Sequence, residues 1–375
     1  MRSALRGVPH EVEPFTDIFF YFDKRGWWTE TIALYSLACD HLEPEDSAAL
    51  GNTLAGLSTA YMRFNIQDLY ADLSQRGMEM LRRLNAREYL PFAMLMYAGG
   101  VSRNGDWQTA EKILWEALPI AEAENPAVAG QIYQNLGVHL LFGGKNTQQS
   151  LIYHQEAYQR FADRGNYWAM CHALFSFGMI ALKTGDLDEA EQRFTQALSL
   201  AKSINFQLHI DDNQTGLSRV ALEKGDWKTA HLLTQDIKRS RLRDGFPQHW
   251  VFEYDTTLAY TAIMLGEAAE AKSYLSETIS LYDRLVLPAV FDRWLITASA
   301  FFVHQSDFSR AATLVGQLSP EASNNFLLRV DKRLFAEILD QCRAALSPEE
   351  FEAAWARGQT LTNEEAIALV AEALR

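Results

Sequence analysis

Cysteine is scarce in this sequence, and the three that occur, Cys39, Cys171 and Cys342, lie far apart along the chain. None belongs to a C-x-x-C pair, so we expect neither a disulfide framework nor a structural zinc site, and a reducing cytoplasm is the natural compartment. The sequence also lacks the run of about 18 apolar residues that a membrane-spanning helix needs. Its first residues, MRSALRGVPHEVEPF, lack the apolar stretch of a signal peptide.

Positive charge is also in short supply. Lys and Arg together number 34 against 48 Asp and Glu, for a formal net charge of −14. Nucleic-acid surfaces need clustered basic residues, so we expect no direct nucleic-acid partner. The densest basic group is Lys238, Arg239, Arg241 and Arg243. We favour a solvated helix end, where cations suit the helix macrodipole, over a phosphate site.

Catalytic motifs are missing as well. The string nearest to a phosphate-binding loop, FGGKNT at 142–147, has Asn after its Lys and His139 where the first Gly belongs. There is no Gly-x-Ser-x-Gly elbow, and the nine histidines show no metal-ligand spacing. We therefore expect no enzyme, no cofactor and no metal site.

Two polar features have structural interpretations. His154 occupies the repeat position that Phe194 holds forty residues later, which predicts a histidine packed in the core. The run HIDDNQ, 209–214, lacks the framework of a calcium loop, and we interpret it as the polar start of a helix.

The sequence does contain an internal repeat with a period of about forty residues. A turn signal recurs with first positions 40, 40, 40, 41 and 40 residues apart, at Gly105, Lys145, Gly185, Gly225, Gly266 and Ser306. Asn65 lies 40 residues before Gly105, and Gly26 lies 39 before Asn65. Repetition at such a spacing is the signature of a stacked repeat protein.

Each turn joins two predicted helices. An apolar stretch precedes it, and an amphipathic one follows, with Leu187, Ala190, Phe194 and Ala197 at helical spacing. Glycine stops the first helix in a left-handed cap, and Asp suits the start of the second. Small residues recur five positions after most turns, at Ala110, Ser150, Ala190, Ala230, Ala271 and Ala311, and twelve after several, at Ala38, Ala117, Ala157 and Ala197. They predict close helix packing.

These positions resemble the tetratricopeptide repeat: Gly178, Ala190 and Ala197 match its small positions, and Phe194 its aromatic one. The period is forty and not thirty-four, and we expect the extra residues in the linker after the second helix, as in KSINFQLH, 202–209. The lengthened repeat resembles the sensor arrays of bacterial signal-transduction ATPases of the MalT and AfsR kind. Residues 19–38 look like the first repeat of such arrays, and 346–375 like their closing tail.

The predicted fold is all-α. We expect a right-handed superhelical solenoid of about eight such hairpins over residues 1–325, and capping helices over 326–375. Ser347 or Asn363 would cap helices there, with Glu350 in a first turn. The tail also superficially resembles the start of a LuxR-type helix-turn-helix, but it is acidic and ends before a recognition helix.

The resemblance implies that the first helix of each pair lines a concave groove. Counting back from each turn gives the candidate binding residues Asn52, Arg63, Phe92, Arg103, Gln131, Gln134, His172, Phe175, Asp212, Arg219, Glu253, Tyr260 and Arg293, with Met179 and Thr215 between them. The four arginines of this set would pair with an acidic peptide or a phosphate-bearing ligand.

Three functions follow from these features. The first is a sensor or scaffold domain of a bacterial signalling or transcription regulator, which binds a peptide, protein or small effector and controls an ATPase module in the same or another chain. The alternative is a structural adaptor or self-associating module that uses exposed aromatics such as Trp27, Trp28 and Trp115. The third is a degenerate hydrolase or nucleotide binder.

Overall fold

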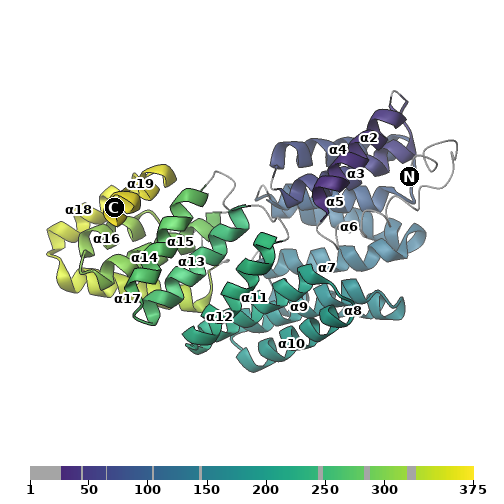
Figure 1. Cartoon of the computed structure of the whole chain (residues 1–375). Helices are drawn as coiled ribbons and strands as arrows, with labels where there is room; N and C mark the ends of the chain where they lie inside the picture. The colour runs from purple at the N-terminus through teal and green to yellow at the C-terminus, as the bar shows by residue number, and fades with distance from the viewer. Residues whose placement is uncertain are drawn as a thin grey trace. The chain divides into compact units, whose positions relative to one another are not determined.

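The computed structural model describes residues 27–43, 45–64, 66–103, 105–142, 146–243, 248–282, 288–318 and 327–375. Helices joined by short turns make up these ranges, with no strand among them (Figure 1). The helices are α2 (Trp28–Leu42), α3 (Ala48–Arg63), α4 (Gln67–Arg83), α5 (Leu90–Arg103), α6 (Trp107–Glu124), α7 (Pro126–Phe142), α8 (Thr147–Asp163), α9 (Tyr167–Thr184), α10 (Leu187–Ser203), α11 (Gln207–Lys224), α12 (Trp227–Arg243), α13 (Gln248–Met264), α14 (Ala268–Leu281), α15 (Pro288–His304), α16 (Phe308–Gly316), α17 (Arg329–Ala345), α18 (Pro348–Gln359) and α19 (Asn363–Leu374). The prediction of an all-α fold is confirmed.

The predicted turns separate paired helices. Those at Gly105, Gly185, Gly225, Gly266 and Ser306 have positive φ, from 60° to 88°, as a left-handed helix cap requires. At four of them an Asp follows and accepts a hydrogen bond from the backbone N–H three residues later. The turns expected at Gly26, Asn65 and Lys145 lie outside the described residues.

The small residues pack where the repeat pattern placed them. All ten alanines and serines five and twelve positions after the turns are fully or almost fully buried. The atypical Thr31 and Tyr70 of the first two repeats are buried as well. Small side chains there let the paired helices approach closely, which explains why the period is visible in the sequence.

The extra residues of the period do not lie in the linkers. α10 runs to Ser203 and α11 begins at Gln207, so only 204–206 of the expected linker are outside a helix. Asn205 there has a φ of 51° and closes a tight turn. The prediction of a longer linker is wrong, because the added residues lengthen the two helices, where apolar side chains such as Ala201 are buried.

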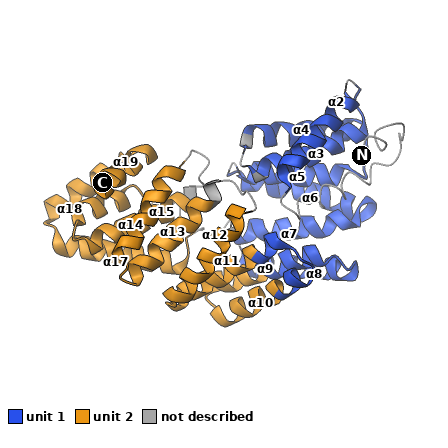
Figure 2. Ribbon diagram, in the orientation of Figure 1, with its two compact units in different colours: residues 1–176, 199–210 blue, residues 177–198, 211–375 orange. Residues whose placement is uncertain are grey.

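The chain divides into two compact units (Figure 2). Unit 1 comprises 1–176 and 199–210, and unit 2 comprises 177–198 and 211–375. In unit 1 the hairpins α3–α4, α5–α6 and α7–α8 stack, and their first helices pack in a row. In unit 2 the hairpins α13–α14 and α15–α16 do the same, with α13 against α15. Each unit is thus a stack of tetratricopeptide-like hairpins.

The C-terminal segment forms three helices that belong to unit 2. α17 packs on α15 and α16, and α18 packs on α16. Ser347 caps α18, and its capping box with Glu350 confirms that prediction. The other predicted cap is off by one residue, since Thr362 and not Asn363 caps α19.

Candidate functional site

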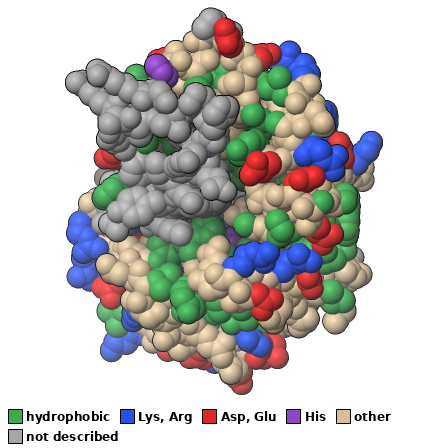
Figure 3. Space-filling model, turned by 90° about the vertical axis from the view of Figure 1, so that its right-hand side faces the viewer, with side chains coloured by type: hydrophobic (Ala, Val, Ile, Leu, Met, Phe, Trp, Pro, Cys, Tyr) green, Lys and Arg blue, Asp and Glu red, His purple; other side chains and the backbone are tan. Residues whose placement is uncertain are grey.

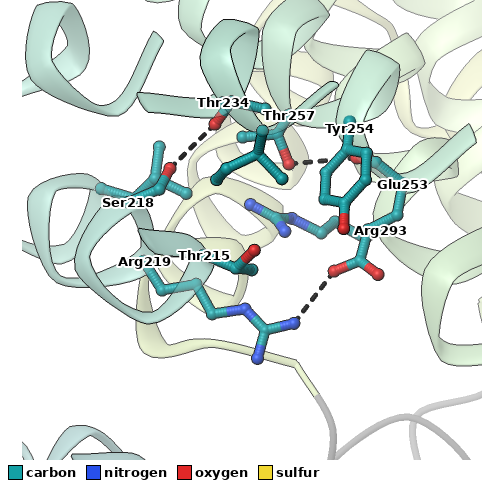
Figure 4. A pocket seen from close by; sticks show the side chains of 10 residues that line it. Thr215, Ser218, Arg219, Thr234, Glu253, Tyr254, Thr257 and Arg293 are labelled. Carbon is teal, nitrogen blue, oxygen red and sulfur yellow. Dashed lines mark hydrogen bonds and ion pairs between the residues drawn. The ribbon is translucent and has the colours of Figure 1, made fainter. Parts of the chain in front are cut away.

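Unit 2 contains a small pocket between α11, α12, α13 and α15 (Figure 4). The empty space is about 250 Å³, a volume that includes solvent at the opening of the pocket. Three predicted groove residues, Arg219, Glu253 and Arg293, line it together with Thr215. Arg219, Glu253 and Arg293 lie on α11, α13 and α15, which are the first helices of three successive repeats. Counting back from the turns predicted these positions. The remaining lining residues are Ser218, Leu222, Thr234, Ile237, Tyr254 and Thr257.

An ion pair spans the pocket from α11 to α13. The Arg219 guanidinium donates to Glu253 Oε1 over 2.9 Å, and both side chains are largely shielded from solvent. Its other Nη lies 3.7 Å from the sulfur of Met179. Partial burial makes such a charge-assisted hydrogen bond stronger than a surface ion pair, so the two residues hold each other in place.

Arg293 enters the pocket from α15. Arg293 is only 7% exposed. Its Nε lies 3.2 Å from Oδ1 of Asp331, at the start of α17. Among the described residues, its Nη2 has no hydrogen-bond partner. Figure 4 shows the guanidinium projecting among the lining side chains. A buried N–H donor without an acceptor is costly, so this atom is a candidate for contact with a ligand.

Hydroxyl groups form much of the remaining polar lining. Ser218 and Thr234 hydrogen-bond to each other over 2.9 Å. Thr215 donates to the carbonyl of Asp211, and Thr257 donates to that of Glu253. Burial raises the pKa of Tyr254 well above its ordinary value, so the phenol is neutral.

The start of α17 is anchored next to this pocket. Glu223 of α11 is nearly buried and accepts the backbone N–H of Val330 over 2.9 Å. It also pairs with Arg333 over 3.3 Å. A carboxylate is favourable at a helix N-terminus, where unpaired N–H groups and the helix dipole meet. Glu223 and Arg293 therefore hold α17 from two helices of the repeat stack.

The basic group at 238–243 is only partly solvated. Arg239 and Arg243 are exposed, as expected. Arg241, however, is buried in an ion pair with Asp211 and Asp212, at 3.2 and 2.7 Å. The interpretation of this group as a solvated helix end is wrong for Arg241, because α11 supplies buried carboxylates. The run HIDDNQ lies at the start of α11, as interpreted from the sequence, and its Asp211 is the fully buried partner of Arg241.

A second buried carboxylate lies nearby in unit 2. Lys238 pairs with Asp255 of α13 and with Glu277 of α14. Burial raises the pKa of Asp255 to about 6, against the lowering effect of Lys238. Lys238 therefore joins three helices of unit 2 and is not part of a phosphate site.

In unit 1 the structure brings together Gln134 and His172. The Gln134 amide contacts His172 Nδ1, and the His172 ring lies 5.6 Å from that of His209. Trp168 and Phe206 surround His209 at 6.2 and 4.6 Å. Sequence reasoning missed the role of His209, which is a buried member of an aromatic cluster.

The other candidates differ in their surroundings. Phe92 and Tyr260, at 3% and 2% exposure, lie in the hydrophobic cores, so placing them on a ligand-facing surface is corrected. Asn52 is also buried, whereas Arg103 is exposed and Gln131 and Phe175 are half-buried. Asp212 is held by Arg241. The side chain of Arg63 lies outside the described residues.

Several lining residues were not predicted. Thr234 and Ile237 belong to α12, a second helix, and counting along first helices does not reach them. Thr257 follows Glu253 by four residues and shares its helix face, a signal that was available in the sequence.

Among the described residues, no group of three or more His, Cys, Asp or Glu is arranged to hold a metal ion. None of the described helices has the length and apolarity to cross a membrane.

The family model of the MalT-like TPR region matches residues 72–354. No curated protein sequence matches the chain.

Three solved structures illustrate the similarity of fold. A Rap protein complexed with competence and sporulation factor is 15% identical, with 71% of this chain and 73% of that chain covered and a TM-score of 0.57. NprR in complex with its cognate peptide NprX is 14% identical, with coverage of 89% and 99% and a TM-score of 0.51. A signal-transduction ATPase with numerous domains and a tetratricopeptide repeat sensor, from Pyrococcus horikoshii, is 14% identical, with coverage of 83% and 49% and a TM-score of 0.52.

Proposed function

The chain belongs to the family of MalT-like TPR regions, and from this premise we propose that it is the sensor or scaffold part of a signalling regulator. It binds a peptide or protein segment on the first-helix face of unit 2. The observation that carries the proposal is the pocket in which Arg219, Glu253 and Arg293 meet from three successive repeats. Polar groups placed among apolar walls are typical of binding sites.

Proteins of similar fold support a peptide or protein ligand. The Rap protein is complexed with competence and sporulation factor, and NprR with its cognate peptide NprX. The Pyrococcus protein joins a repeat sensor to an ATPase. We propose by analogy that binding here controls such a module and that the repeat array itself is not an enzyme. The bacterial origin and cytoplasmic location expected from the sequence belong to the same proposal.

This pocket does not suit the acidic or phosphate-bearing ligand that the sequence led us to expect. Arg219 and Arg293 already face carboxylates of the chain itself, Glu253 and Asp331. An acidic ligand would compete with these internal partners. The pocket therefore favours a ligand that does not bring a further negative charge to it.

Selection of peptides tests the proposal. A library of random nonapeptides displayed on phage is panned against the immobilised chain, and the affinities of enriched peptides are measured by fluorescence polarisation. Arg219→Ala and Glu253→Ala should each weaken binding by about tenfold, as the loss of about 1.4 kcal/mol implies. Arg239→Ala is the control, because that side chain is 76% exposed and outside the pocket. If no enriched peptide responds to the pocket variants, the proposal is wrong.

A second candidate function is self-association. On unit 1, Trp115 and Ile152 are 43% and 46% exposed, and Trp115 contacts Tyr153, so α6 and α8 present apolar side chains together. Figure 3 shows one face of the molecule with hydrophobic side chains at the surface among charged ones. Trp28 is buried and does not contribute, contrary to the expectation from the sequence. Light scattering over a range of concentrations, with Trp115→Ser as the variant, tests this alternative.

A further inference from the structure

The charges around the unit 2 pocket are balanced. Arg219 is paired with Glu253, and Arg293 with Asp331. Among the residues that the structure describes, no third arginine or lysine lines the pocket. A ligand carboxylate or phosphate would thus have no cation of its own, and it would approach the Glu253 carboxylate, which also lines the pocket. Burying an anion without a counter-charge is strongly unfavourable, so the group that enters is neutral.

The pocket nevertheless has hydrogen-bonding capacity of both kinds. Arg293 Nη2 is a buried donor with no acceptor among the described residues. Thr215 and Thr257 each use their hydroxyl proton on a carbonyl of their own helix, at 3.0 and 3.1 Å. Their oxygens therefore remain as acceptors toward the pocket, beside the Glu253 carboxylate. A group that enters must accept from Arg293 and donate to these oxygens.

The shape of the pocket limits the size of that group. Its space of about 250 Å³ includes solvent at the opening, so the enclosed room is much smaller than a site for a whole small molecule. Leu222 and Ile237 are buried apolar side chains in its lining. The pocket accordingly takes one planar or compact group of a larger ligand.

We propose that this pocket is a carboxamide subsite, an inference that rests on the proposed function and specifies its ligand chemistry. The amide carbonyl accepts from Arg293 Nη2, and the amide N–H donates to Thr215, Thr257 or Glu253. The amide comes from an Asn or Gln side chain of the bound segment or from its main chain. Arg293 thereby contacts the ligand through Nη2 and α17 through Nε.

Three small probes test the proposal without a known natural ligand. These are the N-acetyl methylamides of Gln, Met and Glu, titrated into the whole chain labelled at the methyl groups of Ile and Leu. The Ile237 and Leu222 methyl signals report on the pocket walls. A saturating shift with the Gln probe alone supports a side-chain amide, and equal shifts with the Gln and Met probes support a main-chain amide.

Two variants connect the shift to the named atoms. Thr257→Val removes one acceptor without changing the shape and should weaken binding of the amide probe about fivefold or more. Thr256→Val is the matched control, because Thr256 makes the same bond to its own helix, 2.8 Å to the Phe252 carbonyl, but does not line the pocket. Tighter binding of the Glu probe than of the Gln probe, or no methyl shift with any probe, would overturn the carboxamide proposal.

The two proposals fail separately. Peptides that respond to Glu253→Ala, together with a preference for the Glu probe, would leave the proposed function standing and remove the carboxamide subsite. Absence of any pocket-dependent peptide would remove the proposed function, whatever the probes show.

Discussion

Gly216 and Phe194 lie so close that a Cβ added to Gly216 would stand 2.5 Å from Phe194 Cδ1. A Cβ on Gly178 would meet the same ring at 2.6 Å. The buried ring of α10 thus packs against the backbone of α9 on one side and of α11 on the other. One aromatic side chain fixes the spacing between a hairpin and the next first helix.

Gly216→Ala should destabilise unit 2. Overpacking in a tight core costs about 1–3 kcal/mol, whereas the better helix propensity of Ala contributes about 1 kcal/mol. We expect a net loss of up to about 2 kcal/mol in the free energy of unfolding, measured with urea. In the Phe194→Leu background the same change should cost clearly less, since the ring is gone. Equal costs in both backgrounds would contradict this packing.

Ser306→Gly should stabilise the protein. Ser306 has a φ of 60° at a turn where the other described turns have glycine. A non-glycine residue in the left-handed region carries a penalty of about 1 kcal/mol, so its removal should raise the melting temperature. Gly266→Ala is the reciprocal control, because its φ is 78° and no atom lies within 4 Å of an added Cβ. It should lower the melting temperature; a change of the same sign in both variants would refute the argument.

His154→Phe should reduce the sensitivity of the fold to acid. Burial lowers the pKa of His154 to about 4 from 6.5. Between these values the unfolded chain binds the proton more readily, so stability is fully present above pH 6.5 and falls as the pH drops toward 4. Phe occupies the equivalent position in the next repeat as Phe194. Urea unfolding at pH 7, 5.5 and 4.5 should show a smaller loss for the variant than for the wild type.

Glu223→Gln should loosen the start of α17. The substitution removes the charge that faces the Val330 N–H and Arg333, so we expect faster amide hydrogen exchange over residues 328–333. Arg333→Gln should have a weaker effect, because that side chain is 52% exposed. Unchanged exchange in the Glu223 variant would show that Glu223 does not anchor this helix.

Much of the repeat architecture was readable from the sequence. The positive-φ turns, the small residues at the helix contacts and His154 in the core all follow from a pattern in which each repeat makes the same local contacts. Such contacts join residues at most about forty positions apart. They leave a periodic trace because every unit must satisfy the same packing. The linker was placed wrongly because helix length depends on burial as well as on turn residues.

The site was decided by tertiary structure. Asp212, Glu253 and Arg293 all stand thirteen residues before a turn, and nothing in the repeat pattern distinguishes them. Their partners separate them: Arg241 holds Asp212, Arg219 holds Glu253, and Asp331 holds Arg293. The repeat period by itself predicts that these three side chains lie on the same face of the first helices of their repeats. Which of them keeps a free donor depends on α17, whose first turn is anchored by a residue 107 positions away, and a contact of that range leaves no periodic trace.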